Sequence, residues 1–311
     1  MAATEVSIII VNWNAGPQLK TCIDSITQFG GELVDKIIVV DNGSVDGSET
    51  LVEAIPNVTL IRAGENLGFG KACNLGAKSV DSEYLLFLNP DAALFEGTLA
   101  KVVHFMQDPS NQAVGICGVQ LIEESGQVSR SCARYPAVSG FVAHAVGLDR
   151  IFPHLGNPMA EWDHAVDRQV DQVMGAFFLV RRGLFEQLQG FDKRFFVYFE
   201  EVDFSYRAHQ AGWRSFYLAN AQAFHAGGGT SNQVKARRLF YSLRSRLLYA
   251  FKHFSVPAAL TVLFATLLIE PLARSVLALV RRSLPGFKET WAGYFMLWTW
   301  LPTWLFKNET R

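Results

Sequence analysis

The sequence predicts an α/β fold with a mostly parallel sheet flanked by helices, followed by a hydrophobic helical tail. Short apolar, β-branched runs alternate with helix-length segments from the first residues onward, which is typical of a parallel sheet covered on both faces. The 311 residues are 50% hydrophobic and 18% charged, which excludes a disordered or fibrous chain. Residues 235–311 hold 12 of the 28 Lys and Arg residues but only 3 of the 29 acidic ones, so an anionic partner is expected for the tail.

Four strands are expected in the first third of the chain, because each run is short and apolar. They lie at Val6–Val11, Ile37–Val40, Val58–Ile61 and Tyr84–Leu88. Helices are expected between them, starting at Pro17, over Ser48–Ala54 and over Phe69–Val80. Ligands bind at the carboxyl ends of the strands in such sheets, so the polar residues after each strand are the first candidates for a site.

The middle of the chain is expected to complete the sheet. Further strands are predicted at Val114–Val119, Met174–Val180 and Ser215–Tyr217, and helices from about Glu200 to Gly212 and from about Gln233 to His253. The segment Val138–Asp171 mixes Pro, Gly, His and aromatic residues without periodicity, so we expect a long functional loop there. Residues 1–232 are expected to form one domain and 233–311 a separate tail.

The tail has the composition of a membrane-associating segment. His253–Ile269 carries no Asp, Glu, Lys or Arg but is shorter than the roughly 20 residues that a spanning helix needs. An extension to Val280 would include Glu270 and Arg274, four residues apart, which could pair on a helix. Basic flanks and the tryptophans of Trp291–Phe306 are typical of a helix in the interface of an anionic bilayer.

We therefore expect peripheral or monotopic attachment, while a membrane span and burial of the tail in a homo-oligomer stay open. Nucleic-acid binding is not expected, because the aromatic residues of the tail lie among long aliphatic runs. The four cysteines show no Cys-x-x-Cys spacing, which favours a reducing compartment. The N-terminus has no basic region before its apolar run, so a secretory signal peptide is not expected.

Two aspartates follow strands of the predicted sheet. Asp41 comes after the second strand and Asp91 after the fourth, so both are expected at the same edge. A carboxylate there can accept hydrogen bonds from ribose hydroxyls or hold a divalent metal against a diphosphate. Each motif alone is also an ordinary turn former; the two at matched strand ends predict a site.

A second group of carboxylates lies in an aromatic segment. Glu200, Glu201 and Asp203 open a predicted helix directly after the run Phe195–Phe199. Acidic residues favour helix N-termini, but carboxylates among aromatic side chains also suit general-base chemistry on a hydroxyl. Downstream, His225 precedes three glycines, and this pattern predicts contact with a metal or a diphosphate.

Other nucleotide-binding motifs are missing. The segment after Asn66 contains Gly68-Phe69-Gly70 but lacks the third glycine of the dinucleotide fingerprint. The sequence contains no Walker loop, His-Glu-x-x-His or Gly-x-Ser-x-Gly motif. An oxidoreductase and a P-loop enzyme are therefore excluded.

Over residues 5–255 the chain resembles the family 2 glycosyltransferases, and within them the rhamnosyltransferases of bacterial surface polysaccharides. The segments that carry this resemblance are VSIIIVNWN, VVDNGSVDGS, ENLGFGKACNLG, YLLFLNPDA, GAFFLVRR, FFVYFEEVDFSYRAHQAGW and HAGGGTS. The resemblance implies a GT-A fold, a sugar-nucleotide donor, Mg²⁺ or Mn²⁺, and inversion at the anomeric carbon. It also implies a nucleotide-binding half of about 1–120 and an acceptor half of about 121–232.

The resemblance also implies roles for individual residues on the donor side. Asp41 would bind the nucleoside and Trp13 would stack on the base. The nucleotide pocket would be lined by Asn66, Lys71 and Asn74. Asn89-Pro90-Asp91 stands in the place of the family's Asp-x-Asp motif, with asparagine at its first position.

The metal and the base are assigned in the same way. Asp91 would be the surer metal ligand of its motif, and His225 the second one. Glu200-Glu201 matches the family's Glu-Asp pair, whose second member is the base, so Glu201 is favoured and Glu200 stays open. Asp203 completes the expected catalytic group.

The function that follows is transfer of a sugar, most simply L-rhamnose from dTDP-rhamnose, to a polyprenyl-diphosphate-linked saccharide in O-antigen-like polysaccharide synthesis. The expected location is the cytoplasmic face of the bacterial inner membrane. A UDP-hexose or UDP-galactofuranose donor is the alternative within the same chemistry. A catalytically idle, membrane-associated scaffold that still binds a nucleotide is the alternative from another class.

Overall fold

The computed structural model describes residues 6–227 and 235–307. The chain divides into two compact units. The first comprises residues 1–134, 162–193 and 200–230, and the second comprises 135–161, 194–199 and 231–311. Two segments that the sequence analysis placed before the tail, 135–161 and 194–199, thus belong to the second unit.

The first unit is built on a nine-stranded sheet of order β3-β2-β1-β4-β10-β6-β11-β5, with β8 paired to β11. The strands are β1 Val6–Asn12, β2 Val34–Asp41, β3 Val58–Arg62, β4 Tyr84–Leu88, β5 Ala92–Leu94, β6 Val114–Ile122, β8 Arg168–Val170, β10 Phe177–Arg181 and β11 Arg214–His225. A separate pair is formed by β7 Cys132–Ala133 and β9 Gln172–Val173.

The mostly parallel sheet is confirmed, although three of its strands, β5, β8 and β10, run antiparallel to their neighbours. Strands β1 to β4 run parallel to one another, and β6 runs parallel to β11. In contrast, β10 is antiparallel to both β4 and β6, and β5 is antiparallel to β11. A short apolar run does not indicate its own direction, so the sequence could not predict these reversals.

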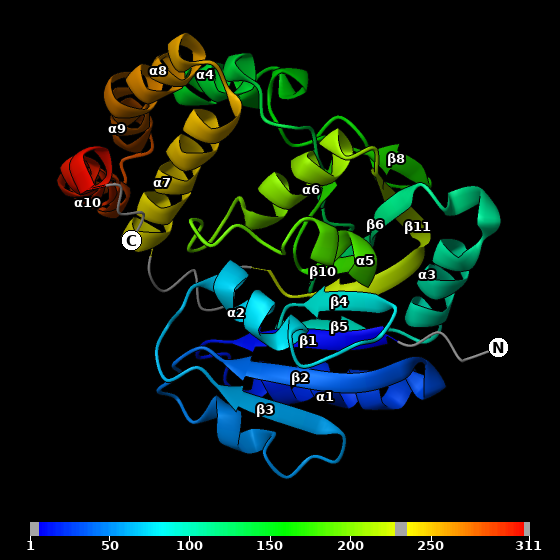
Figure 1. Cartoon of the computed structure of the whole chain (residues 1–311). Helices are drawn as coiled ribbons and strands as arrows, with labels where there is room; N and C mark the ends of the chain where they lie inside the picture. Colours follow the sequence, from blue (N-terminus) through cyan, green and yellow to red (C-terminus); the bar gives the residue numbers. More distant parts are fainter. Residues whose placement is uncertain (1–5, 228–234, 308–311) are drawn as a thin grey trace. The chain divides into compact units, whose positions relative to one another are not determined.

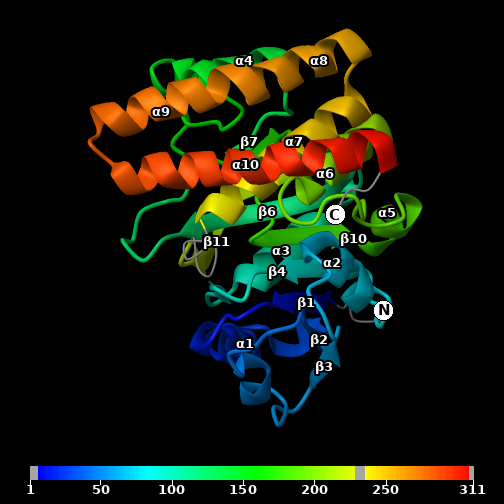
Figure 2. The same cartoon turned by 90° about the vertical axis from the view of Figure 1, so that its left-hand side faces the viewer.

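Helices cover both faces of this sheet (Figures 1 and 2). On one face α1 (Pro17–Phe29) and α3 (Thr98–Gln107) pack their apolar residues into the main core. On the other lie α2 (Phe69–Ala77), α5 (Arg182–Gln187) and α6 (Glu200–Gln210). Helix α1 begins at Pro17, as predicted from its fixed φ and missing N–H.

Several predicted boundaries are wrong. Ser48–Ala54 forms only a 3-10 turn at Ser48–Leu51, and β11 extends well beyond Ser215–Tyr217 in the C-terminal direction. The long loop predicted over Val138–Asp171 contains α4 (Val138–Val146) and β8. Helix α4 is apolar almost throughout, so no polar face marks its period.

The second unit is helical. It contains α4, α7 (Lys235–His253), α8 (Val256–Phe264), α9 (Glu270–Val280) and α10 (Leu284–Lys307). A π-helical turn at Ala265–Ile269 joins α8 to α9 just before Pro271, which has no N–H to close an ordinary turn. Figure 2 shows α8 and α9 end to end, with α10 alongside. The helix Val256–Val280 is long and apolar enough to cross a membrane.

Candidate active site

The first unit gathers the predicted polar residues at one edge of its sheet. Asn12 pairs with Asp41 where the parallel strands β1 and β2 end. The antiparallel register of β11 and β5 pairs His225 with Ala92, the residue after Asp91. Because β4 also ends here, Asp41, Asp91 and His225 share this edge. The strand register thus groups residues that lie far apart along the chain.

Asp91 and His225 are in direct contact. His225 Nε2 lies 3.4 Å from Asp91 Oδ1, and each side chain is about one-tenth exposed. The backbone N–H of Ala226 donates to the Asp91 carbonyl over 3.1 Å, which holds the two chain segments together. The predicted glycines Gly228 and Gly229 lie outside the described residues.

This pair fits a divalent cation that is also held by a substrate. Within residues 6–227 and 235–307, no group of three or more His, Cys, Asp or Glu side chains could hold a metal. One carboxylate and one imidazole leave coordination positions for phosphate oxygens and water, the way Mg²⁺ is commonly bound. The metal-binding roles of Asp91 and His225 stay predictions.

Asp41 is held in place by its neighbours. Asn12 is fully buried, and its side-chain amide donates to Asp41 Oδ1 over 3.0 Å and to the hydroxyl of Ser48 over 2.8 Å. The backbone N–H of Ser44 donates to Asp41 Oδ2 over 3.3 Å. The carboxylate is thus oriented by donors from β1 and the following turn. The sequence places Asn12 among the polar residues at the strand ends, but its buried position directly opposite Asp41 appears only in the register.

A pair of asparagines joins the two turns beside Asp41. Asn42 Nδ2 donates to Asn66 Oδ1 over 3.1 Å, and Asn42 Oδ1 accepts from Leu67 N over 2.8 Å. Asn66 Oδ1 also accepts from Gly68 N over 3.0 Å. Asn66 therefore shapes the loop before α2, and its predicted contact with the nucleotide stays a prediction. Gly43 lets the backbone of the turn after β2 approach that of Glu65 and Asn66 closely.

Gly43→Ala is expected to lower the free energy of unfolding by more than the roughly 2 kcal/mol that left-handed backbone costs a non-glycine residue. The φ of Gly43 is +78°, and a Cβ there would lie 2.9 Å from the Glu65 carbonyl carbon. This clash adds to the cost of the backbone conformation. Because the turn lies beside Asp41, nucleotide binding should weaken as well. Gly47→Ala is the matched control, because φ is +75° and a Cβ would meet nothing within 4 Å. Chemical denaturation compares them, and equal losses would contradict the close-approach argument.

Glu200 and Glu201 lie at the start of α6, against two glycines. A Cβ on Gly70 would lie 3.4 Å from the Glu200 side chain, and one on Gly175 would lie 3.9 Å from that of Glu201. One oxygen of each carboxylate, Oε2, is buried without a hydrogen-bond partner among the described residues. Such acceptors can take a hydrogen bond from a substrate hydroxyl.

Burial changes the acidity of both groups. It raises the pKa of Glu200 well above the ordinary glutamate value, and the neighbouring Glu201 carboxylate raises it further. Burial also raises the pKa of Glu201, while backbone hydrogen bonds oppose the shift. A raised pKa makes a carboxylate a stronger base. Both pKa values are thus shifted in the direction that strengthens a general base.

The segment Gly175–Ala176 connects the carboxylates to the Asp91 motif. Gly175 faces Glu201, and the Ala176 carbonyl accepts a hydrogen bond from Asn89 N over 3.0 Å. This contact arises because β10 enters the sheet at the end where β4 leaves it. The base candidate and the metal candidates thus lie at the same edge. Sequence analysis did not predict a role for Gly175.

Glu200→Gln is expected to stabilise the fold at pH 8 but not at pH 4. With its raised pKa, folded Glu200 holds a proton that the unfolded chain has already lost above about pH 4.3. Stability therefore falls as pH rises from that value through the folded pKa. Glutamine is neutral throughout and of similar volume, so the difference in Tm should open with pH. Thermal unfolding of both proteins at pH 4, 6 and 8 measures this difference. A Tm difference that does not change with pH would contradict a raised pKa of Glu200.

The structure does not support a catalytic role for Asp203. Its carboxylate is fully buried, and Asp203 Oδ2 accepts from Arg207 Nε over 2.7 Å. Arg207 also donates to the carbonyls of Leu188 and Gly190. Asp203 therefore helps to position the loop before the aromatic segment. Helix spacing alone did not show that the Asp203 carboxylate pairs with Arg207, and the catalytic role of Asp203 stays a prediction.

The remaining predicted residues lie near the same edge. Both polar atoms of the Asn74 amide bond to the backbone of Phe191, over 2.8 and 2.9 Å. This positioning role was missed. Trp13 directly follows β1, Lys71 lies in the first turn of α2, and both are partly exposed. The nucleotide-binding roles of Trp13, Lys71, Asn74, Asn89 and Asp41 stay predictions.

A sequence match decides the family. The sequence pattern of the family described as Glycosyl transferase family 2 matches residues 7–189. The chain belongs to glycosyl transferase family 2. It is therefore a glycosyltransferase, as the resemblance implied, and Asp41, Asp91 and Gly175 all lie within the matched residues.

Three curated relatives extend the match beyond residue 189. The N-acetylglucosaminyl-diphospho-decaprenol L-rhamnosyltransferase of Mycobacterium tuberculosis is 30% identical over 254 residues, 75% of this chain and 79% of the relative. The rhamnosyltransferase WbbL of Escherichia coli is 25% identical, over 78% of this chain and 92% of WbbL. The O-antigen chain rhamnosyltransferase RfbN of Salmonella typhimurium is 26% identical, over 74% of this chain and 68% of RfbN.

Solved structures share the fold. A mannosyltransferase from Pyrobaculum calidifontis, in complex with GDP-Man and Mn²⁺, aligns with a TM-score of 0.56 at 20% identity, over 98% of this chain and 88% of that one. Staphylococcus aureus TarS residues 1–349 align with a TM-score of 0.53 at 13% identity, over 92% of this chain and 90% of the TarS chain. Together with the family, these similarities show the GT-A glycosyltransferase fold.

Proposed function

We propose that this glycosyltransferase moves L-rhamnose from dTDP-rhamnose to a hydroxyl of a polyprenyl-diphosphate-linked saccharide, with inversion and with Mg²⁺ or Mn²⁺. One observation carries the chemistry: the Glu201 carboxylate lies on the Gly175–Ala176 segment, which also bonds to Asn89 beside the Asp91–His225 pair. Support for the sugar and the acceptor comes from the relatives named rhamnosyltransferases, one of which is named for a diphospho-decaprenol substrate.

The residues divide the reaction between them. Asp91 and His225 would hold the cation, which supplies charge neutralisation for the leaving nucleoside diphosphate. Asp41, oriented by Asn12, binds the nucleoside. Glu201 accepts the proton of the acceptor hydroxyl, and that oxygen forms the new bond to the anomeric carbon as the bond to phosphate breaks. Direct displacement from the opposite face gives inversion.

The proposal is tested by following nucleoside diphosphate release and product mass with a panel of donors. We expect turnover with dTDP-rhamnose, a divalent cation and a short polyprenyl-diphosphate-linked N-acetylglucosamine. Turnover confined to a UDP-hexose or UDP-galactofuranose would overturn the choice of donor. Donor binding without transfer to any lipid-linked acceptor would favour the idle scaffold.

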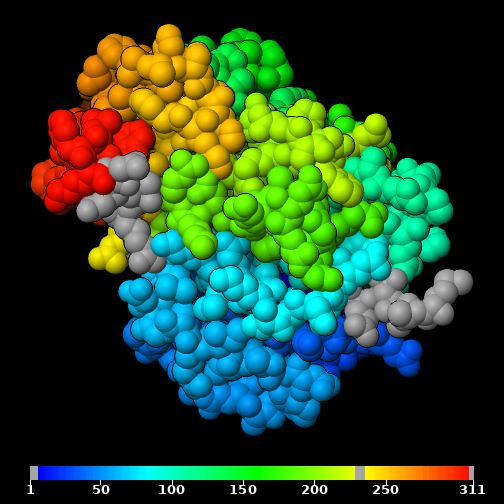
Figure 3. Space-filling view, in the orientation of Figure 1, coloured from blue at the N-terminus to red at the C-terminus, as the bar shows by residue number. Residues whose placement is uncertain are grey.

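We also propose attachment to an anionic membrane surface, at the cytoplasmic face of the inner membrane, through the second unit. The helix from Val256 to Val280 exposes large apolar side chains and buries several polar ones. Exposed apolar side chains recur every four residues along it, at Val256, Leu260, Phe264, Leu268, Leu272, Val276 and Val280, and Leu279 is exposed as well. The buried side chains on the same helix include Thr266, Glu270 and Ser275. Figure 3 shows the atoms of α8, in orange, at the surface of this unit.

Charge supports an interfacial position of this helix. Buried Glu270 pairs with Arg246 of α7 and with Arg274, whose Nε donates over 2.8 Å. Arg281 and Arg282 are exposed at the end of α9, where they can contact anionic headgroups. The basic flank expected before this helix includes Arg244 and Arg246, and these two side chains are buried instead.

Replacing Leu260, Leu268 and Val276 together by serine is expected to weaken binding to phosphatidylglycerol vesicles on the order of 100-fold. Three half-exposed side chains contribute about 3 kcal/mol to apolar transfer, and their exposure in the protein leaves the fold intact. Leu51, Val128 and Val166, exposed apolar residues of the first unit, give the matched triple-serine control. Vesicle co-sedimentation measures the difference, and equal binding of both triple variants would contradict this attachment.

A further inference from the structure

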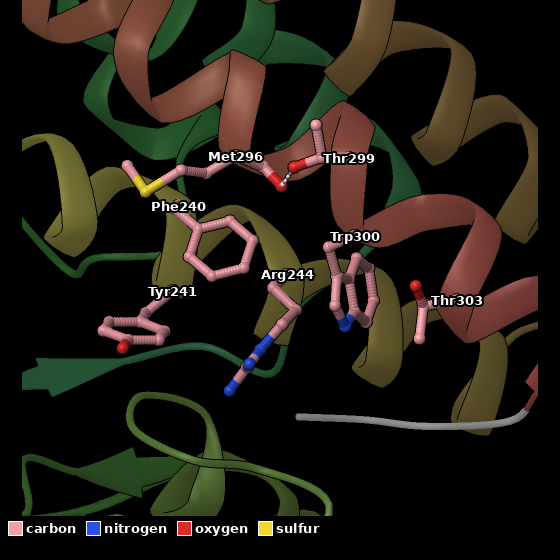
Figure 4. Close-up of a pocket in the computed structure, with 7 residues that line it drawn as sticks. All are labelled: Phe240, Tyr241, Arg244, Met296, Thr299, Trp300 and Thr303. Carbon is pink, nitrogen blue, oxygen red and sulfur yellow. Dashed lines mark hydrogen bonds between the residues drawn. The ribbon is translucent and has the colours of Figure 1, made fainter.

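A pocket of about 390 Å³ lies in the second unit, between α7 and α10. Its lining side chains come from both helices and are labelled in Figure 4: Phe240, Tyr241, Arg244, Met296, Thr299, Trp300 and Thr303. None of them is acidic. None belongs to the site described above.

Arg244 is the charged residue of this pocket. It is only 2% exposed. Its guanidinium carbon lies 5.1 Å from the ring centre of Tyr241, 5.4 Å from that of Phe240 and 6.0 Å from that of Trp300. Aromatic faces offset part of the cost of burying a cation, and a guanidinium has five N–H donors, several of which can serve an anion placed in the pocket.

Trp300 adds a second hydrogen-bond donor. It is 6% exposed, and its Nε1 has no hydrogen-bond partner among the described residues. An indole N–H can only donate, so a ligand that satisfies it must carry an acceptor atom. In Figure 4 the guanidinium of Arg244 and the indole nitrogen of Trp300 lie at the same end of the pocket. An oxygen-rich anion matches both groups.

The outer surface of α10 indicates how such an anion is carried. Phe295, Trp298, Leu305 and Phe306 are exposed on this helix, and a helix that exposes several large apolar side chains is typical of a lipid or protein contact. Guanidinium groups are well matched to phosphate oxygens. A phosphoryl group that is attached to a lipid chain fits the pocket and the apolar surface together.

We infer that the Arg244–Trp300 pocket binds the diphosphate of the isoprenoid-linked acceptor. This inference rests on the proposed function and names the part of the chain that holds the lipid carrier. The shared chemistry is a phosphoryl group, which a bulk phospholipid or free pyrophosphate also carries. The test therefore separates these sources.

The experiment measures binding of geranylgeranyl diphosphate to the full chain in detergent by calorimetry. Trp300→Phe keeps an aromatic ring and removes the donor, so we expect about tenfold weaker binding. Trp291→Phe is the matched control, since Trp291 Nε1 is also buried without a partner among the described residues and does not line the pocket. Arg244→Gln should weaken binding more than Trp300→Phe does. Unchanged affinity in Trp300→Phe would overturn the inference.

Two further probes identify the source of the phosphoryl group. Inorganic pyrophosphate should bind at least 100-fold more weakly than the prenyl diphosphate, and equal affinity would overturn a lipid-borne ligand. Binding to phosphatidylglycerol vesicles should not change in Trp300→Phe, and a tenfold loss there would reassign the pocket to bulk phospholipid. dTDP binding is measured on the same samples, so failure of the donor site is distinguished from failure of this pocket.

Discussion

Glu201→Gln is expected to lower turnover by about 10²- to 10⁴-fold while dTDP binding stays within a factor of two. Removing a general base has an effect of this size, and glutamine keeps the volume and one oxygen of the side chain. The loss should appear in kcat, because the proton leaves the acceptor hydroxyl only as the new bond forms. Steady-state release of dTDP and calorimetry of dTDP binding separate the two quantities.

The acidity of Glu201 adds a pH signature to this prediction. The base must be ionised, so kcat/KM should fall as pH decreases through its pKa. Burial raises that pKa, so the fall should occur above about pH 4.3, the ordinary value for glutamate. Glu200→Gln is the comparison variant, since its side chain is buried beside Glu201. A large loss only in Glu200→Gln would transfer the role to Glu200, and full activity in both variants would contradict a carboxylate base.

Asp91→Asn is expected to lower turnover roughly 10³-fold and to raise the Mn²⁺ concentration needed for half-maximal activity. A bound cation stabilises the charge of the leaving diphosphate by several kcal/mol, which corresponds to several powers of ten in rate. The amide keeps the shape of the side chain but loses its charge. A titration of activity with Mn²⁺ at saturating donor measures both effects.

The controls for Asp91 come from the same unit. His225→Gln should also raise the Mn²⁺ requirement, because Nε2 of His225 lies 3.4 Å from Asp91. Asp24→Asn removes an exposed carboxylate that pairs with Lys20 on α1, and such pairs contribute little to stability, so the Mn²⁺ requirement should not change. An Asp91→Asn enzyme with the original Mn²⁺ requirement would contradict the assignment of the ligand.

The fold was predictable where the sequence shows a regular apolar pattern that is bounded by turn or helix-start residues. β1 and α1 were predicted correctly because a β-branched run, a turn and Pro17 follow one another directly along the chain. The direction of β10 and the helix α4 were not, because a uniformly apolar segment shows neither its orientation nor a polar face. The length of β11 was underestimated, since polar residues such as Asn220 and Gln222 interrupt its apolar pattern.

The site was predictable as a set of residues but not as a geometry. Asp91 and His225 could be singled out from their motifs, whereas their contact depends on the pairing of β5 with β11. No role was predicted for Gly175 or for Asn12 at the end of the first strand, because a glycine and a buried asparagine carry no chemical signal of their own. The pairing of Asp203 with Arg207 was not visible in the sequence either, and the catalytic role of Asp203 stays a prediction.

Crystals soaked with Mn²⁺ and dTDP test the central claim most directly, through the anomalous scattering of manganese. We predict one strong anomalous peak within coordination distance of Asp91 and His225, bridged to the diphosphate, with the Glu201 carboxylate facing the same space. A manganese peak bound by other side chains, or a diphosphate seated away from this edge of the sheet, would contradict the mechanism.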